Sequence, residues 1–167
     1  MVIRLEETAD EAAVHALNAA VFPTPAEADL VDALRVRARP IVSLVAVDGG
    51  AVVGHILFSP VSLDGFEDRS LMGLAPMAVA PARQRRGIGS QLVRAGLEAC
   101  GNLGCGAVVV LGHPDYYPRF GFSTAARRGL TCEYDAPDEA FMVLELRRDY
   151  LAGAEGVIRY HPAFDAL

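Results

Sequence analysis

The chain has 167 residues, enough for one domain with its own hydrophobic core. Hydrophobic residues make up 52% and charged residues 22%, a composition that excludes a mainly disordered chain. The formal net charge of −6 argues against a general nucleic-acid partner, because contacts with phosphates need clustered positive charge.

Missing residue types and segments exclude further classes. All fifteen basic residues are arginine, which excludes Schiff-base chemistry on a protein lysine and a Walker-type phosphate loop. Glycine and proline interrupt the longest apolar stretch, residues 71–82, and a membrane helix needs roughly 20 apolar residues. The first residues contain no signal-peptide core, so we expect a cytoplasmic location and no membrane partner.

Three cysteines, Cys100, Cys105 and Cys132, contain no C-x-x-C pair. Their odd number and wide spacing argue against a disulfide framework or a zinc site. We expect them to be small buried residues and expect no metal.

The hydrophobic pattern predicts a mixed α/β fold. Alternating or continuous apolar residues predict strands at 2–6, 41–47, 51–63, 70–80, 107–111 and 141–146. Apolar residues at helical spacing predict a helix capped by Thr8 with Glu11, and further helices at 26–36 and 87–101. A short helical turn is expected at 114–120, and 157–164 predicts a last strand or an interface arm.

One predicted strand contains a proline. Pro76 cannot donate a ladder hydrogen bond, so we expect a bulge or a separation of strands at this point. The order of elements predicts an antiparallel front half and at least one parallel crossover.

The segment from Met77 to Leu92 carries the strongest chemical signal. A buried strand enters a short loop that opens a helix, whose first N–H groups and dipole favour an anion. Gly87 and Gly89 leave room for close approach, and Arg83, Arg85, Arg86 and Arg94 add positive charge in a region without acids. The segment predicts a site for a phosphate-bearing ligand.

This segment has two alternative interpretations. A dinucleotide fingerprint is incomplete, because Leu92 stands where its third glycine would be. The simpler alternative is a solvated arginine-rich helix start whose glycines serve only the turn.

Residues 84–89, QRRGIG, resemble the Q/R-x-x-G-x-G/A signature of the GNAT superfamily, the acyl-CoA-dependent N-acyltransferases. Downstream, residues 116–122, YYPRFGF, are similar to the Y-x-x-x-G-F segment of that superfamily, and residues 54–60, GHILFSP, resemble its YhbS-like branch. The resemblance covers nearly the whole chain. It implies a single acyl-CoA N-acyltransferase domain over 1–167, with a C-terminal arm at about 152–167.

The resemblance also implies a fold and a cofactor site. The fold is a mostly antiparallel sheet, flanked by helices, in which the parallel strands 70–80 and 107–111 splay apart around acetyl-CoA as co-substrate. The implied cofactor-binding residues are Met77, Ala78, Val79, Gln84, Arg85, Arg86, Gly87, Ile88, Gly89 and Ser90. Backbone at 77–79 would pair with the pantetheine arm, the amides at 85–90 would hold the pyrophosphate, and Arg83 or Arg86 would reach the ribose phosphate.

The implied reaction is direct attack of a primary amine on the thioester. Tyr117 stands where the family keeps its general acid, whereas Tyr116 is expected to pack. The family often uses a glutamate on the bulged strand as base, and this chain has none there. His113 is our candidate base, with Asp115, His55 and bulk water as alternatives.

Non-enzymatic alternatives stay open. A degenerate relative could hold acyl-CoA as a sensor without turnover, and a scaffold would not bind it at all. The acceptor, a small molecule or a peptide, is not readable from the loops 64–68 and 123–138. A homodimer through the apolar tail also stays open.

Overall fold

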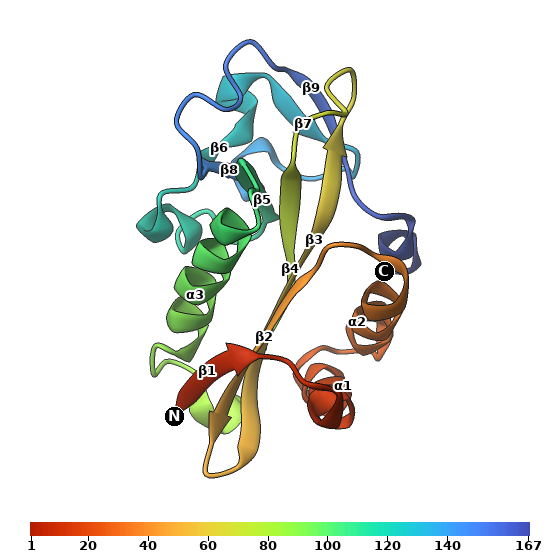
Figure 1. Cartoon of the computed structure of the whole chain (residues 1–167), viewed down its shortest axis with the longest axis vertical. Coiled ribbons are helices and arrows are strands. Elements are labelled where there is room, and N and C mark those ends of the chain that lie inside the picture. Colours follow the sequence, from red (N-terminus) through yellow and green to blue (C-terminus); the bar gives the residue numbers. More distant parts are fainter.

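A mixed β-sheet runs through the computed structural model, which describes all 167 residues (Figure 1). The strands are β1 (Val2–Leu5), β2 (Val42–Asp48), β3 (Ala51–Leu63), β4 (Leu71–Val79), β5 (Ala107–Leu111), β6 (Ser123–Thr124), β7 (Leu130–Cys132), β8 (Phe141–Glu145) and β9 (Gly156–Arg159). Their order is β1-β2-β3-β4-β5-β8-β6, with β9 paired to β3 and β7. Only the β4–β5 and β7–β9 pairs are parallel, which confirms the predicted mixed fold.

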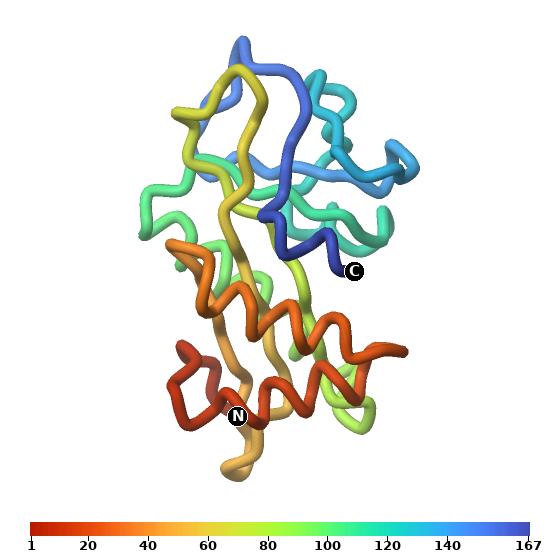
Figure 2. Tube along the Cα trace, turned by 90° about the vertical axis from the view of Figure 1, so that its right-hand side faces the viewer, coloured from red at the N-terminus to blue at the C-terminus, as the bar shows by residue number.

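Three α-helices cover the sheet, α1 (Glu11–Val21), α2 (Ala26–Arg37) and α3 (Ile88–Asn102). α1 and α2 lie side by side across one face, with the C-terminal turn next to α2, and α3 covers the other face (Figures 1 and 2). None of these helices combines the length and apolar character needed to cross a membrane.

Close packing fixes α3 against the sheet. A Cβ atom at Gly96 would lie 2.2 Å from Cε1 of the buried Phe58, so only glycine lets the helix approach β3 this closely. Cys100 and Cys105 are buried as predicted, and Cys132 is half-buried.

The first helix begins differently from our prediction. Residues Thr8–Asp10 form a 3₁₀ turn, and α1 starts only at Glu11. Asp10, not Thr8, provides the polar contacts here: its carboxylate accepts a hydrogen bond from the Glu7 N–H at 2.8 Å and pairs with Arg4 at 2.7 Å. The ion pair with Arg4 is a contact of Asp10 that the local sequence pattern does not reveal.

The late part of the chain contains more strands than expected. β6 and β7 lie within the predicted loop 123–138, and they are too short to produce a readable alternation. The tail forms β9, followed by a 3₁₀ turn at Pro162–Ala166 that buries Phe164.

The feature that positions the site is the separation of β4 from β5. The two strands pair only where Leu71–Leu74 of β4 lies beside Ala107–Val110 of β5, although β4 continues to Val79. Just beyond, the register with β3 shifts between Ile56 and Phe58, so that two residues of β4, Ala75 and Pro76, oppose Leu57 alone. This bulge at Pro76 was predicted, and it leaves the far half of β4 with one unpaired edge.

A buried polar group links α1 to the sheet. His55 on β3 is fully buried between Ser43, at 2.9 Å from Nε2, and the Asn18 amide, at 3.3 Å from Nδ1. An amide nitrogen only donates, so Nδ1 accepts and Nε2–H donates to Ser43. Burial, assisted by the charge of Arg35, lowers the pKa of His55 to about 3.

We therefore predict a specific loss of stability in acid. The unfolded chain binds a proton at His55 near pH 6.5, whereas the folded chain does not until about pH 3. The free energy of unfolding should fall by about 1.4 kcal/mol per pH unit across this window, about 2 kcal/mol by pH 5. Urea unfolding of wild type and His55→Gln at pH 7.5 and pH 5 checks this. The variant should be less stable overall but show a flatter pH dependence, and equal slopes would contradict the assignment.

Candidate functional site

A cavity lies at the start of α3. Gly87 takes a left-handed conformation, with φ of 82°, and turns the loop into the helix, which an L side chain resists. The N–H groups of Ile88, Gly89 and Ser90 have no intrahelical acceptor and carry the positive end of the helix dipole. This helix-start cavity has a volume of about 520 Å³ and is lined by Val21, Met77, Val79, Arg83, Gln84, Arg85, Gly87, Ile88, Gly89, Ser90, Tyr116 and Arg119.

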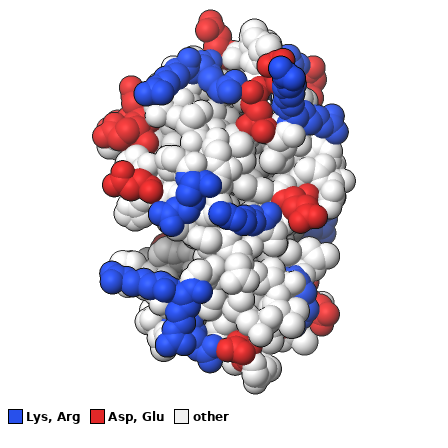
Figure 3. All heavy atoms as spheres, turned by 90° about the vertical axis from the view of Figure 1, so that its left-hand side faces the viewer, with Lys and Arg blue, Asp and Glu red and all other residues white.

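Arginine side chains give the cavity its charge. On the face covered by α3, they border a hollow in the surface (Figure 3). Arg83 is held by an ion pair with Asp48, which lowers the pKa of that carboxyl. Arg85 forms no ion pair and is exposed, so its charge is available to an anion.

Tyr116 borders the helix start directly. Its hydroxyl lies 3.2 Å from the Ser90 hydroxyl, and a Cβ atom at Gly89 would lie 3.2 Å from the same oxygen. Arg119 stacks on the Tyr116 ring at 4.4 Å from its centroid and donates to its carbonyl at 2.8 Å. Sequence reasoning missed Arg119 as a lining residue and expected only packing from Tyr116.

A second cavity, the splay cleft, opens where β4 leaves β5. It has a volume of about 590 Å³ and shares Met77 and Tyr116 with the helix-start cavity. Its lining residues are Phe22, Glu27, Leu30, Leu74, Ala75, Pro76, Met77, Leu111, Gly112, His113, Tyr116, Tyr117 and Leu167. The two cavities are therefore neighbours along the unpaired edge of β4.

Tyr117 is the buried aromatic residue of the splay cleft. Its ring packs edge-on against Tyr116 and Phe122, with centroids 5.0 and 5.7 Å away. A Cβ atom at Gly112 would lie 2.5 Å from the Tyr117 ring, so this glycine makes space for it. Burial raises the pKa of Tyr117 to about 12, so the phenol is protonated at neutral pH and is a weaker acid than a solvated tyrosine.

Besides the two tyrosines, two titratable side chains line the splay cleft. His113 follows β5 and is exposed, whereas Glu27, in the first turn of α2, is half-buried. Glu27 is the only carboxylate of the cleft and forms no ion pair there. Sequence reasoning missed it, because helical spacing alone does not tell which cavity a polar residue on α2 faces.

Most predicted cofactor residues line the helix-start cavity, namely Met77, Val79, Gln84, Arg85, Gly87, Ile88, Gly89 and Ser90. Ala78 is buried with its backbone paired to His55, and Arg86 is exposed outside the cavity. Gln84 donates to the Val79 carbonyl at 3.0 Å and so fastens the loop to β4.

The other base candidates lie elsewhere. The hypothesis that His55 borders the cleft is wrong, because the sheet and α1 enclose it completely. Asp115 is exposed and lines neither cavity. No cysteine lines them either, and burial raises the pKa of Cys100, which disfavours a thiolate nucleophile.

One group of side chains has the spacing of metal ligands. Ligand atoms of His15, Asp29 and Asp32 lie within 4.8 Å of one another on the surface of α1 and α2. Asp32 is already paired with His15 and Arg35, and this group lies outside both cavities.

The fold and the two cavities agree with a family assignment. Residues 5–122 match the model of the acetyltransferase (GNAT) family. The chain belongs to this family and is an acetyl-CoA-dependent N-acetyltransferase.

Individual relatives match over almost the full length. The chain is 40% identical over 166 residues to the N-acetyltransferase YhbS of Escherichia coli K12, covering 99% of each. The crystal structure of E. coli YhbS in complex with CoA superposes with a TM-score of 0.93, over 98% of this chain and 91% of that one. A GNAT family acetyltransferase from Brucella melitensis, in complex with acetyl-CoA, is 36% identical and has a TM-score of 0.81 over 98% and 97% of the two chains.

Proposed function

We propose that this protein transfers the acetyl group of acetyl-CoA to a primary amine of a small molecule or peptide, by direct attack in a ternary complex. One observation carries the proposal: the helix-start cavity and the splay cleft adjoin along the unpaired edge of β4, with Tyr117 in the cleft. One long donor could span both, its phosphates at the helix and its thioester beside Tyr117. The CoA and acetyl-CoA complexes of the two full-length relatives support this donor.

In the proposed complex, the backbone of Met77, Ala78 and Val79 pairs with the pantetheine arm as an added strand would. The amides from Arg85 to Ser90 hold the pyrophosphate, with positive charge from Arg85. Arg86 remains a candidate for the ribose phosphate. Arg83 is less available, because Asp48 already neutralises it.

The proposed reaction moves protons at the acceptor nitrogen, at the leaving thiolate and at Tyr117. The acceptor ammonium first loses a proton, since an amine attacks only in its neutral form. The nitrogen lone pair then adds to the thioester carbonyl, and a backbone N–H near Val79 stabilises the oxyanion. The tetrahedral intermediate collapses as the C–S bond breaks, and Tyr117 gives its proton to the departing thiolate. The nitrogen, positively charged since the attack, loses its second proton to give the neutral amide, and solvent returns a proton to the Tyr117 phenolate.

For the first transfer we propose His113. It is the one histidine that lines the splay cleft, and histidine is the most frequent general base in enzymes. It is exposed at the cleft mouth, so it can pass the proton to solvent.

The experiment that tests the function measures free thiol from acetyl-CoA across a panel of primary amines, together with thermal stabilisation by CoA. Stabilisation with amine-dependent thiol release supports the transferase. Stabilisation without release from any amine would favour an acyl-CoA sensor instead, and no stabilisation would favour a scaffold.

Gly89→Asp should abolish CoA binding. The new side chain begins 3.2 Å from the Tyr116 hydroxyl and brings negative charge to the proposed pyrophosphate site. Calorimetry with CoA checks this, with Gly101→Asp near the far end of α3 as the control that keeps affinity. Unchanged affinity in Gly89→Asp would mean that the cofactor binds elsewhere.

Tyr117→Phe should lower kcat by about 100-fold, the usual contribution of a positioned acid, with little change in CoA affinity. Tyr116→Phe is the matched control, because its hydroxyl lies beside Ser90 and should affect CoA binding more than turnover. If Tyr116→Phe proves to be the slower enzyme, the acid role belongs to Tyr116.

A further inference from the structure

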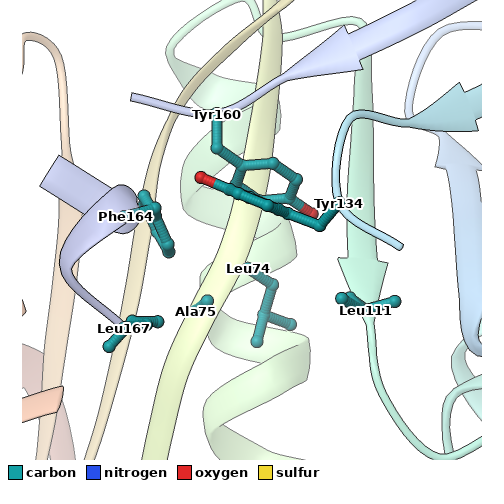
Figure 4. Close-up of a pocket in the computed structure, with 7 residues that line it drawn as sticks. All are labelled: Leu74, Ala75, Leu111, Tyr134, Tyr160, Phe164 and Leu167. Carbon is teal, nitrogen blue, oxygen red and sulfur yellow. The ribbon is translucent and has the colours of Figure 1, made fainter. Parts of the chain in front are cut away.

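A third cavity adjoins the splay cleft and has no role in the reaction described so far. It has a volume of about 330 Å³ and only apolar or aromatic lining residues: Leu74, Ala75, Leu111, Tyr134, Tyr160, Phe164 and Leu167 (Figure 4). We call it the apolar cavity. It shares Leu74, Ala75, Leu111 and Leu167 with the splay cleft, so the two cavities meet where β4 and β5 separate.

The apolar cavity lies between small residues of β4 and larger side chains of the C-terminal segment. A Cβ atom at Gly73 would lie 2.8 Å from the Tyr160 ring, so the glycine lets that ring lie against the strand. In Figure 4 the rings of Tyr134 and Tyr160 cross over β4, with Leu111 on one side and Phe164 and Leu167 on the other. The Tyr160 hydroxyl is buried and has no hydrogen-bond partner.

Size and polarity restrict what can enter. A dry protein cavity of about 150 Å³ already binds benzene, so this volume accepts an aromatic ring or a branched alkyl group with a short linker. The cavity contains no charged side chain, which excludes an ammonium or carboxylate group. The acetyl group of the donor has only two carbons and needs none of this space.

Charge recognition lies in the adjoining cleft instead. An alkyl amine has a pKa of about 10.4 and is a cation in neutral water. Glu27 is the only carboxylate that lines the splay cleft, and no arginine neutralises it. A cationic head group would therefore lie near Glu27 and an apolar body would lie in the apolar cavity.

Resting on the proposed transfer reaction, we infer that the acceptor is a primary amine with a compact apolar or aromatic body and no carboxylate beside the amine. Glu27 attracts the ammonium group, and the apolar cavity holds the body.

The test compares ethylamine, butylamine, phenethylamine and phenylalanine as acceptors, by thiol release at saturating acetyl-CoA. We expect kcat/KM for phenethylamine to exceed that for ethylamine at least tenfold, because even one buried methylene is worth about tenfold. Phenylalanine should react more slowly than phenethylamine, since its carboxylate meets Glu27. Equal rates for ethylamine and phenethylamine would overturn the inference but leave the transferase intact, whereas no release from any amine would overturn both.

Variants locate the two recognition elements. Ala75→Leu fills the apolar cavity and should lower the ratio of kcat/KM for phenethylamine to kcat/KM for ethylamine at least about fivefold. Leu167→Trp, at an exposed position, should lower the same ratio. Stabilisation by acetyl-CoA verifies that each variant is folded. Glu27→Gln should raise KM for phenethylamine about tenfold with a small change in kcat, whereas Asp29→Asn, on the same turn of α2 but outside the cleft, should change neither.

The competing occupant is a longer acyl chain of the donor. Hexanoyl-CoA should be no better a donor than acetyl-CoA if the cavity serves the acceptor. If Ala75→Leu instead lowers turnover of hexanoyl-CoA and leaves the amine preference unchanged, the apolar cavity belongs to the donor and the inference is wrong.

Discussion

The separation of β4 from β5 after Leu74 is the constraint on which the site depends. Pro76 has no N–H to donate, and the bulge places two residues of β4 opposite one of β3. The strand therefore bends while it stays attached to β3, and its other edge loses its partner. All three cavities described above open from this region, because an unpaired strand edge and a diverging neighbour leave space that side chains from helices only partly fill.

The start of α3 is positively charged, although the chain as a whole is negatively charged. The chain as a whole is acidic, yet free amides, a helix dipole and arginines converge at one helix end. Gly87 and Gly89 serve different purposes there: Gly87 takes the left-handed turn, and Gly89 leaves room beside Tyr116. The position of α3 is in turn fixed by Gly96 against Phe58, so the proposed anion site depends on a contact in the core.

The titratable groups of the molecule divide by environment. His55 is held neutral in the core by burial and by its contacts with Ser43 and Asn18, and it stabilises the fold. Tyr117 is buried at the cleft wall, and burial keeps its phenol protonated at neutral pH. Glu27 and His113 are far apart along the chain, and the fold brings both to one cleft. Such a division supports separate roles in stability, acid chemistry and substrate recognition.

Features that depend on local physics could be predicted from the order of residues alone. The local sequence pattern predicted β3 and β5 with their observed bounds, and the proline inside β4 predicted the bulge, because backbone geometry and the missing N–H act within a few residues. The glycines and arginines at the start of the helix likewise predicted an anion site. Features that depend on distant segments could be seen only in the folded chain. They are the enclosure of His55 by α1, the pairing of Arg83 with Asp48, the position of Glu27 in the cleft lining, and the apolar cavity closed by the C-terminal turn. Each of these joins residues far apart along the chain, and periodicity contains no information about which distant surfaces come into contact.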